Sequence, residues 1–429
     1  MKKINIFFGW YIVLAAMATM FIGGSVQGYA TGVFFIPMSE EFNWTRTEFI
    51  GSITVSYIVT AIIAVFIGGY LDRHGGRKLM FIGTTIMIIC LLLLAEIENL
   101  WQWYLIRGVF LSIGVALATF LVVQAAIAKW FVRYRGRAIG ISLVGLSITG
   151  IMTPSLLTPF VDEFGWRAGW QIMALLTACL LYPAALTMRR EPEDYGMLPD
   201  GIQKNTTDDK NNVQNIEEKS ITRKQAMRTS NFWIVLVAYS LASLTFPAVG
   251  AHTIPFLTDA GFERTRAAAM LSLFAFPGLL TRPIWGIIAE KIDIRYLSCF
   301  AFIACPIGIG IVLIGTQSLN YNLVIIGYLT LGISISGVVP LQEIVWPLLF
   351  GRKHIGSIRG AVMPFMIILS STSPLLVSAY YDSVGNYTGI WIVFSMLSFF
   401  ASIMIVFMKK VSSNSTKITP GNHVANRPD

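Results

Sequence analysis

Two ionisable residues, Arg282 and Glu343, lie deep inside long apolar runs of this sequence. Such residues are costly in a membrane-length apolar run, so they indicate a functional site by default. Arg282 comes eight residues before Glu290, and Glu343 comes nine residues before Arg352. In a helix this spacing places both roughly 12 Å inside the boundary, close to the bilayer midplane. A guanidinium there can bind an anion, a carboxyl there can bind and release a proton, and the two could also form a permanent ion pair.

Two other titratable residues belong to apolar runs. Arg107 lies early in one run, and it could take part in proton coupling or reach water from the outer end of its helix. His252 lies near the outer end of another run. Histidine titrates near neutral pH, which suits proton or ligand binding, although a lone histidine commonly makes a structural hydrogen bond instead. We predict Glu343 as a proton-coupling residue and His252 as a substrate contact.

Membrane-spanning helices must position these side chains. The residues are 55% hydrophobic and only 13% charged, with a mean hydropathy of +0.66, whereas soluble domains contain about 25% charged residues. Runs long enough to cross roughly 30 Å of hydrocarbon occur at 9–36, 47–71, 79–97, 101–129, 138–160, 168–187, 231–257, 267–289, 296–316, 322–349, 357–380 and 388–408. The sequence therefore predicts an all-α membrane protein with twelve transmembrane helices.

The positions of the basic residues predict the orientation of the chain. Most of the 32 Lys and Arg residues fall at the N-terminus, in alternate loops or in the C-terminal tail, and an excess of bases marks the cytoplasmic side. We expect a multi-pass protein of the cell (plasma) membrane with both termini cytoplasmic. The formal charge of +9 then follows from membrane insertion, so we expect the lipid bilayer, and no nucleic acid, as a partner.

The sequence offers little for enzyme chemistry. Its four Cys residues have no metal-ligand spacing, so a metal site is not expected. We find no phosphate-binding loop and no nucleophile with a base at useful spacing. We therefore predict no metal, no cofactor and no enzymatic activity.

A ten-residue pattern occurs twice. The segments GGYLDRHGGR at 68–77 and GIIAEKIDIR at 286–295 each have a Gly, an acid four residues later, a base after it, and an Arg five residues after the acid. Such a duplication predicts two pseudo-symmetric six-helix bundles with a site between them, the organisation of a transporter. We predict four regions: an N-terminal bundle 1–187, a cytoplasmic linker 188–230, a C-terminal bundle 231–409 and a disordered cytoplasmic tail 410–429.

The first copy of the pattern resembles the cytoplasmic loop signature of the major facilitator superfamily. Four further segments resemble the monocarboxylate transporter and oxalate:formate antiporter branch of that superfamily: WFVRYRGRAIGI at 130–141, EPEDYGMLPDG at 191–201, HTIPFLTDAGF at 252–262 and the pair Arg282-Pro283. The resemblance implies the major facilitator fold, with a central cavity and alternating access.

The two copies of the pattern lie in loops that could close and open the inner face. They place charges where helix ends meet the cytoplasm, so these charges can form a network that closes the inner face in one conformation and opens it in the other. The alternative is that the loop bases only direct insertion. The predicted gating residues are Gly68, Asp72, Arg73, Arg77, Glu290, Lys291 and Arg295.

The resemblance also implies roles for Arg107 and Arg282. Arg107 resembles the membrane arginine of other proton-coupled members of the superfamily, so we predict it as a proton-coupling residue. In the carboxylate-transporting branch an arginine at the place of Arg282 anchors the substrate, and a planar guanidinium suits a carboxylate because two parallel hydrogen bonds can form. Tyr29 stands close to where animal monocarboxylate transporters carry a lysine, and its hydroxyl can donate to a substrate oxygen. The run 357–380 contains a single basic residue, Arg359, which lies at its cytoplasmic start. Because an oxalate carrier would need a second deep cation there, the sequence favours a single carboxylate.

These observations predict a secondary active transporter that moves a small, lactate- or pyruvate-like monocarboxylate with proton symport. In this hypothesis Arg282 binds the carboxylate, and Tyr29 and Gln124 donate orienting hydrogen bonds. Gln124 corresponds to Glu343 under the duplication, and Glu343 or His252 carries the proton. The alternatives are an organic anion exchanger of the oxalate:formate type and a non-transporting membrane receptor. The sequence predicts no particular oligomeric state.

Overall fold

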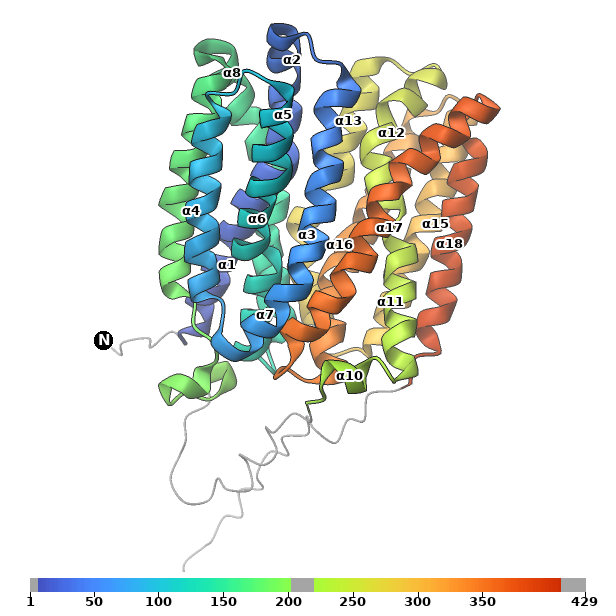
Figure 1. Ribbon diagram of the computed structural model, residues 1–429. Coiled ribbons are helices and arrows are strands. Elements are labelled where there is room, and N and C mark those ends of the chain that lie inside the picture. Colours follow the sequence, from blue (N-terminus) through green and yellow to red (C-terminus); the bar gives the residue numbers. More distant parts are fainter. Residues whose placement is uncertain (1–6, 202–219, 410–429) are drawn as a thin grey trace, which may run out of the picture.

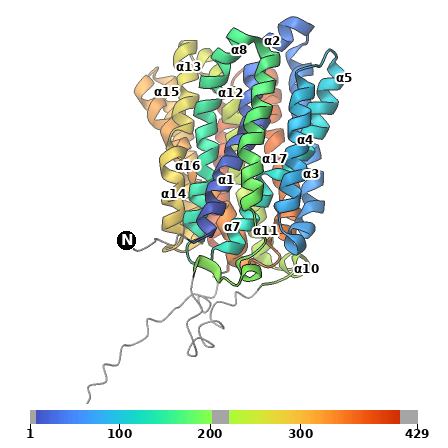
Figure 2. The same cartoon turned by 90° about the vertical axis from the view of Figure 1, so that its left-hand side faces the viewer.

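The computed structural model describes residues 7–201 and 220–409. The predicted tail 410–429 and residues 202–219 of the predicted linker lie outside the described residues. The described chain is helical, with no strand among its elements. The helices run side by side and form a bundle that is one helix length tall (Figures 1 and 2).

The described part of the N-terminal half contains five continuous helical stretches of membrane-spanning length, two of them broken into shorter elements. They are α1 (Gly9–Gly24), η1 (Ser25–Tyr29) and α2 (Ala30–Phe42); α3 (Arg46–His74); α4 (Arg77–Leu94); α5 (Leu100–Gln102), η2 (Trp103–Leu111), α6 (Ser112–Ala118) and α7 (Phe120–Trp130); and α8 (Arg135–Thr187). The elements η1 and η2 are π-helical turns, which apolar periodicity does not predict.

Helix α8 accounts for two of the predicted spans. Its 53 residues would extend about 80 Å at 1.5 Å per residue, far more than a bilayer is thick. The chain reverses at Gly165, where φ is 83°, a left-handed conformation that glycine adopts without strain. Eleven continuous apolar stretches among the described residues therefore provide twelve spans, as predicted.

The C-terminal half contains the other six spans. They are α11 (Ser230–Ser243) with α12 (Thr245–Asp259); α13 (Arg264–Ala275) with α14 (Pro277–Ala289); α15 (Ile294–Gln317); α16 (Tyr321–Phe350); α17 (Ile355–Val384); and α18 (Thr388–Val406). The predicted linker contains three short helices, η3 (Pro192–Tyr195), η4 (Pro199–Gly201) and α10 (Arg223–Ala226). The boundaries of the four predicted regions stay predictions.

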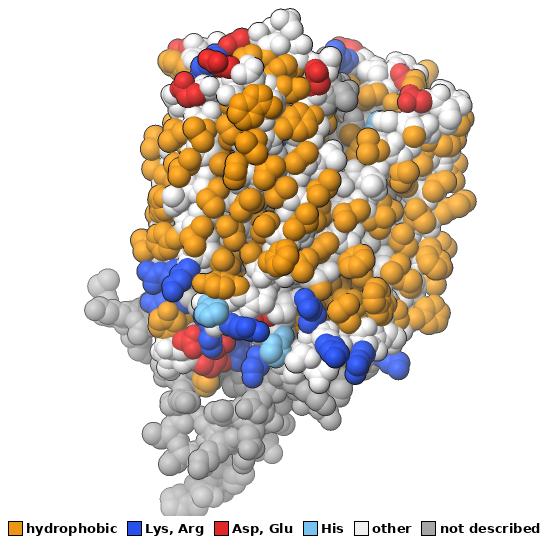
Figure 3. Space-filling model, in the orientation of Figure 1, with side chains coloured by type: hydrophobic (Ala, Val, Ile, Leu, Met, Phe, Trp, Pro, Cys, Tyr) orange, Lys and Arg blue, Asp and Glu red, His pale blue; other side chains and the backbone are white. Residues whose placement is uncertain are grey.

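The described ends of the chain and of the linker lie together at one end of the molecule, lowest in Figure 1. We call this the linker end. Lys and Arg side chains gather there, and hydrophobic side chains cover the flank above them (Figure 3). This distribution is the one that the positive-inside rule associates with a cytoplasmic face.

The two halves pack together mainly at the linker end. One cluster of buried apolar side chains there includes residues of both halves, such as Trp130 and Trp346. At the opposite end each half has its own cluster, one around Trp170 and the other around Trp391. The helices that meet most extensively across the halves are α3 with α17 and α8 with α14. The halves are thus joined at the linker end and separate at the other.

Candidate functional site

A wide cavity of about 1300 Å³ lies between the halves. At the end away from the linker its lining includes the exposed residues Glu40 and Asp162, and toward the linker end it includes Gln342 and Arg359. The cavity therefore extends from the opposite end down to the level where α17 begins. Its lining comes from both halves, as the duplication predicts.

A second, smaller cavity of about 250 Å³ lies within the N-terminal half. It is lined by the glycine-rich part of the first span, including Gly23, Gly24 and Gln27, and by Thr119 at the break between α6 and α7. Four residues line both cavities: Gly28, Tyr29, Tyr57 and Phe120. The small cavity therefore adjoins the wide one at these four residues.

Arg282 connects the two halves. It lies on α14 with only 7% of its surface exposed, and its Nη1 donates to the carbonyl oxygen of Leu143 and to Ser147 Oγ, each at 2.7 Å. Both acceptors belong to α8 and are neutral. Its buried Nε has no hydrogen-bond partner among the described residues, and Tyr29 lies within electrostatic reach. Among the described residues this guanidinium therefore has no anionic hydrogen-bond partner. Arg282 does not itself line either cavity, but its neighbour Tyr29 lines both.

Glu343 forms its ion pair with Arg359, on the neighbouring helix α17, and not with Arg282. Both side chains are nearly fully buried. Arg359 lines the wide cavity, and its Nε and Nη1 have no hydrogen-bond partner among the described residues. Arg359 lies one turn after the start of α17 at Ile355, where the sequence placed it, and its side chain still reaches the wide cavity. A second cation therefore faces the pathway.

Arg107 is a buried residue of the N-terminal half. Only 2% of its surface is exposed, so the interpretation that it reaches water from the helix end was wrong. Its guanidinium donates to Ser56 Oγ at 3.0 Å, Thr31 Oγ1 at 2.6 Å and the carbonyl oxygen of Gln27 at 3.2 Å. All three acceptors are neutral. Arg107 thus ties the first, second and fourth spans together beside the small cavity.

Two predicted substrate contacts lie away from the cavities. Gln124 is 4% exposed and donates to Ser142 Oγ at 3.1 Å inside the N-terminal half. His252 Nε2 donates to the carbonyl oxygen of Pro374 at 3.0 Å, which links α12 to α17. Neither belongs to the described lining of either cavity. Of the four predicted substrate residues, Tyr29 is the one that faces both.

At the linker end, α3 closes against α17 through the Asp72 contact, which we define as Gly68, Asp72, Gly356 and Ser357. The Asp72 carboxylate accepts hydrogen bonds from the backbone N–H of Gly356 at 2.8 Å, the backbone N–H of Ser357 at 2.7 Å and the Ser357 hydroxyl. A Cβ on Gly68 would lie 2.3 Å from the Gly356 carbonyl oxygen. The carboxylate thus occupies the positive N-terminus of α17.

The repeat forms the same arrangement between α14 and α8. We call it the Glu290 contact and define it as Gly136, Arg137, Gly286 and Glu290. The Glu290 carboxylate accepts from the backbone N–H of Arg137 at 2.9 Å and from its Nε at 2.8 Å. A Cβ on Gly286 would lie 2.0 Å from the Gly136 carbonyl oxygen. Burial raises the pKa of the Glu290 carboxyl above its ordinary value, and the N–H groups of Arg137 oppose that rise.

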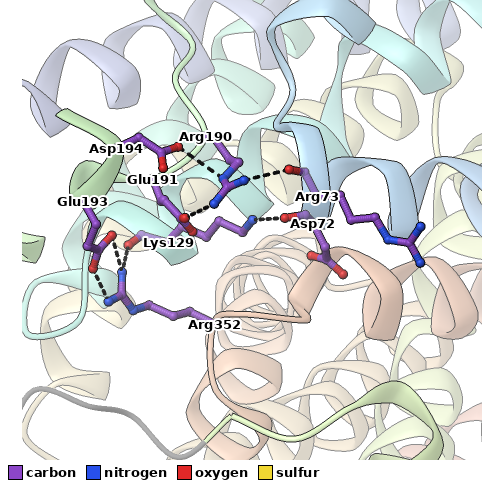
Figure 4. Close-up of polar contacts among 8 residues, drawn as sticks. All are labelled: Asp72, Arg73, Lys129, Arg190, Glu191, Glu193, Asp194 and Arg352. Carbon is purple, nitrogen blue, oxygen red and sulfur yellow. Dashed lines mark hydrogen bonds and ion pairs between the residues drawn. The ribbon is translucent and has the colours of Figure 1, made fainter.

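Within the described part of the chain, the other predicted gating residues make no side-chain hydrogen bond or ion pair across the halves. Arg73 and Arg77 are exposed, and Arg73 contributes only its carbonyl oxygen, which accepts from Arg190 (Figure 4). Lys291 is exposed as well. Arg295 pairs with Asp293, two residues before it, within the C-terminal half. Their charges fit insertion better than closure.

A network beside the Asp72 contact also joins the halves (Figure 4). Arg352, after α16, donates to the carbonyl oxygen of Lys129 at 2.7 Å and pairs with Glu193 of the linker. Lys129 Nζ in turn donates to the carbonyl oxygen of Asp72 at 3.1 Å. Sequence reasoning missed Lys129 and Arg352. It also missed the partner residues of the two contacts, of which Gly136 and Gly356 could have been identified from the matching positions of the repeats.

Comparison with known proteins identifies the family. The model of the Major Facilitator Superfamily matches residues 6–372, so the chain belongs to this superfamily, and it is a multi-pass membrane transporter rather than an enzyme. The structure is similar to that of the proton:xylose symporter XylE bound to 6-bromo-6-deoxy-D-glucose, with a TM-score of 0.76 at 14% identity over 94% of this chain and 96% of that chain. The likeness confirms the predicted fold.

Curated relatives share about a quarter of their aligned residues with this chain. Monocarboxylate transporter 4 of Gallus gallus is 25% identical over 78% of this chain and 68% of its own length. Monocarboxylate transporter 2 of Homo sapiens is 24% identical over 67% of this chain and 61% of its own. The uncharacterized MFS-type transporter YcxA of Bacillus subtilis is 23% identical over 95% of this chain and 97% of its own length.

Proposed function

We propose that this protein carries a small monocarboxylate, such as lactate or pyruvate, across the cell membrane with a proton, and that its linker end faces the cytoplasm. The observation that carries the proposal is the buried guanidinium of Arg282, which joins the halves through neutral acceptors alone. A buried cation without a counter-ion is costly, so a carboxylate that enters the site gains a charge-assisted pair. The names of the monocarboxylate transporter relatives support this substrate class.

Tyr29 is the residue placed to assist Arg282. It lines both cavities, and it lies within electrostatic reach of the guanidinium. Its hydroxyl can donate to the second carboxylate oxygen while Arg282 binds the first. Gln124 and His252 act indirectly in this proposal, because their hydrogen bonds position α8 and α17.

Glu343 is the residue proposed to carry the proton. It is the only Asp or Glu that is buried among the described residues, and its partner Arg359 lines the wide cavity. An anion moving alone into a negative-inside cell works against roughly 2.3 kcal/mol per 100 mV, and one co-transported proton removes this cost. A substrate carboxylate near Arg359 would compete with Glu343 for the guanidinium and favour protonation of Glu343.

The two linker-end contacts support an alternating-access mechanism. In the described conformation the Asp72 and Glu290 contacts hold the linker end closed, while the wide cavity extends to the opposite end. Release of both contacts would allow the halves to rock and open the site to the linker side. Each contact uses a carboxylate from one half and a helix N-terminus from the other.

The test is uptake of labelled lactate or pyruvate into vesicles that contain the purified protein. We expect an inward proton gradient to accelerate uptake, and we expect Arg282→Ala to abolish it at equal membrane abundance. Arg264→Ala, which removes an exposed arginine at the opposite end, should transport normally and serves as the matched control. Normal uptake by Arg282→Ala would contradict the anchor role. Uptake that is indifferent to the gradient would contradict symport.

One observation favours a second candidate, exchange of organic dianions. A carrier of dianions needs a second cation beside Arg282, and Arg359 provides one because it lines the wide cavity. Its Nε and Nη1 have no hydrogen-bond partner among the described residues. An exchanger would show oxalate uptake that requires internal substrate and no proton gradient. Loss of that counterflow in Arg359→Gln, with lactate uptake absent in the parent protein, would replace the monocarboxylate proposal.

A further inference from the structure

The boundary between the two cavities has an unusual composition. Of the four residues that line both, three carry rings, namely Tyr29, Tyr57 and Phe120, and the fourth is Gly28. We call these four residues the neck. A solute that passes from the wide cavity to the small one must pass between three rings at the place where the first span has no side chain. The neck therefore controls access to the small cavity, whose lining residue Leu146 precedes Ser147, an acceptor of Arg282.

Gly28 has no structural reason to be a glycine. A Cβ there would meet no heavy atom within 4 Å, and its φ is not in the left-handed region. Its neighbours differ, because a Cβ on Gly23 would lie 3.0 Å from Thr119 Cγ2 and one on Gly24 would lie 2.9 Å from Leu146 Cδ1. Those two glycines permit close packing, whereas Gly28 only leaves space in the pathway. Glycine inside a helix costs roughly 0.5–1 kcal/mol relative to alanine, so this space has a stability cost.

The backbone at Gly28 directs several consecutive residues to the same side. Gly28 lies in the π-helical turn Ser25–Tyr29, and Gln27, Gly28 and Tyr29 all line the small cavity. Single π-helical turns inside α-helices are frequent at functional sites. This turn therefore brings the Tyr29 ring and the open position of Gly28 to the neck together.

The small cavity limits what can lie beyond the neck. Its volume of about 250 Å³ is below the range of roughly 300–1,000 Å³ for pockets that bury drug-sized ligands, whereas the wide cavity exceeds that range. A three-carbon acid fits the small cavity with room for water. An acid that carries an aromatic ring would have to leave its ring in the neck, where Tyr57 and Phe120 already lie.

We propose that the neck is a size filter and that Gly28 sets its aperture, so that the transported acids are small aliphatic carboxylates and aryl-substituted ones are rejected. This inference rests on the proposed carboxylate transport. Gly28 admits the substrate through the absence of a side chain, and the rings of Tyr57 and Phe120 define the opposite wall. Added bulk at Gly28 narrows the neck, and a smaller residue at Phe120 widens it.

The experiment measures uptake of a series of labelled acids by the purified protein in vesicles: acetate, lactate, 2-hydroxybutyrate and phenyllactate. Gly28→Ala and Gly28→Val should lower uptake of 2-hydroxybutyrate relative to acetate in graded steps. The Val variant should lower it by at least about tenfold, because Val adds three carbon atoms to this open position and a single methylene in an apolar pocket changes discrimination by roughly 10–200-fold. Phe120→Leu and Phe120→Ala should raise uptake of phenyllactate relative to lactate. The Leu variant retains most of the side-chain volume if Ala destabilises the protein.

Gly32→Ala is the matched control. Gly32 lines the wide cavity only, and a Cβ there also meets no heavy atom within 4 Å, so this substitution should leave the ratios unchanged. If Gly28→Val lowered the uptake of all acids equally, or if Gly32→Ala shifted the uptake ratios as much as Gly28→Ala does, the size filter would be overturned while carboxylate transport stands. Failure of the parent protein to take up any acid of the series would overturn both proposals.

Discussion

The Asp72 contact and the Glu290 contact solve the same problem with different chemistry. Both place two glycines back to back and a carboxylate on the N-terminus of a helix from the other half. Asp72 accepts from two backbone N–H groups and a hydroxyl of α17, which cannot move independently of that helix. Glu290 instead accepts one of its two hydrogen bonds from the side chain of Arg137, which is 40% exposed.

The comparison shows which features the duplicated unit requires. The glycine pairs and the carboxylates occur at matching positions in both repeats, because they determine how closely the helices approach and what holds them. The donors beyond the first backbone N–H differ between the repeats. Lys129 supports only the Asp72 contact, through the carbonyl oxygen of Asp72. We therefore expect the two contacts to respond alike to bulk and differently to loss of charge.

The largest effect should come from bulk at the glycine pairs. Gly68→Val and Gly286→Val would each place a Cβ 2.0–2.3 Å from a backbone oxygen, so the closed linker end cannot form. We expect at least a hundredfold loss of uptake from either substitution, measured in vesicles alongside the labelling of a cysteine introduced into the wide cavity by a reagent applied from the linker side. That labelling should increase.

Gly69→Ala is the control for this prediction. It lies beside Gly68, but a Cβ there would only touch Ser357 Oγ at 3.9 Å. Its uptake should match that of the parent protein. If Gly68→Val and Gly286→Val both transported normally with unchanged labelling, the glycine pairs would have no part in closure.

A smaller effect should distinguish the two contacts. In Asp72→Asn an amide N–H₂ replaces one of the two carboxylate oxygens. The backbone N–H of Gly356 or of Ser357 then faces this N–H₂ and loses its acceptor, and a backbone N–H of α17 cannot move away. A charge-assisted hydrogen bond contributes roughly 1.5–3 kcal/mol, so uptake should fall by about tenfold or more. Glu290→Gln should fall by less than about threefold, because its carbonyl oxygen can still accept from the backbone N–H of Arg137 while the exposed guanidinium turns away.

Initial uptake rates at equal membrane abundance check this order. A Glu290→Gln protein that loses as much activity as Asp72→Asn would show that the exposed guanidinium matters as much as the backbone donors. The comparison of the two contacts would then rest on their glycines alone.

Sequence reasoning predicted the height of residues in the membrane better than the direction in which they point. Hydropathy located all twelve spans, and the duplication located both carboxylates. The duplication placed Gln124 level with Glu343, and hydropathy placed His252 near the outer end of its span. Rotation about the helix axis depends on packing, however, and both side chains hydrogen-bond to neighbouring helices. Arg359 was underrated for a related reason, because its long side chain reaches the cavity from the first turns of α17.

The smallest expected effect is a pH dependence that belongs to the Glu290 contact. Burial in the closed form raises the pKa of this carboxyl above the ordinary value of 4.5, whereas exposure to water in the open form would restore that value. The closed form then binds more protons than the open form between pH 4.5 and the raised pKa, so acidification on the linker side favours closure. Labelling of the cavity cysteine from that side should fall modestly as pH is lowered through this window. Glu290→Gln removes the titrating group and should make the labelling independent of pH there, and a dependence that survives the substitution would assign it to another residue.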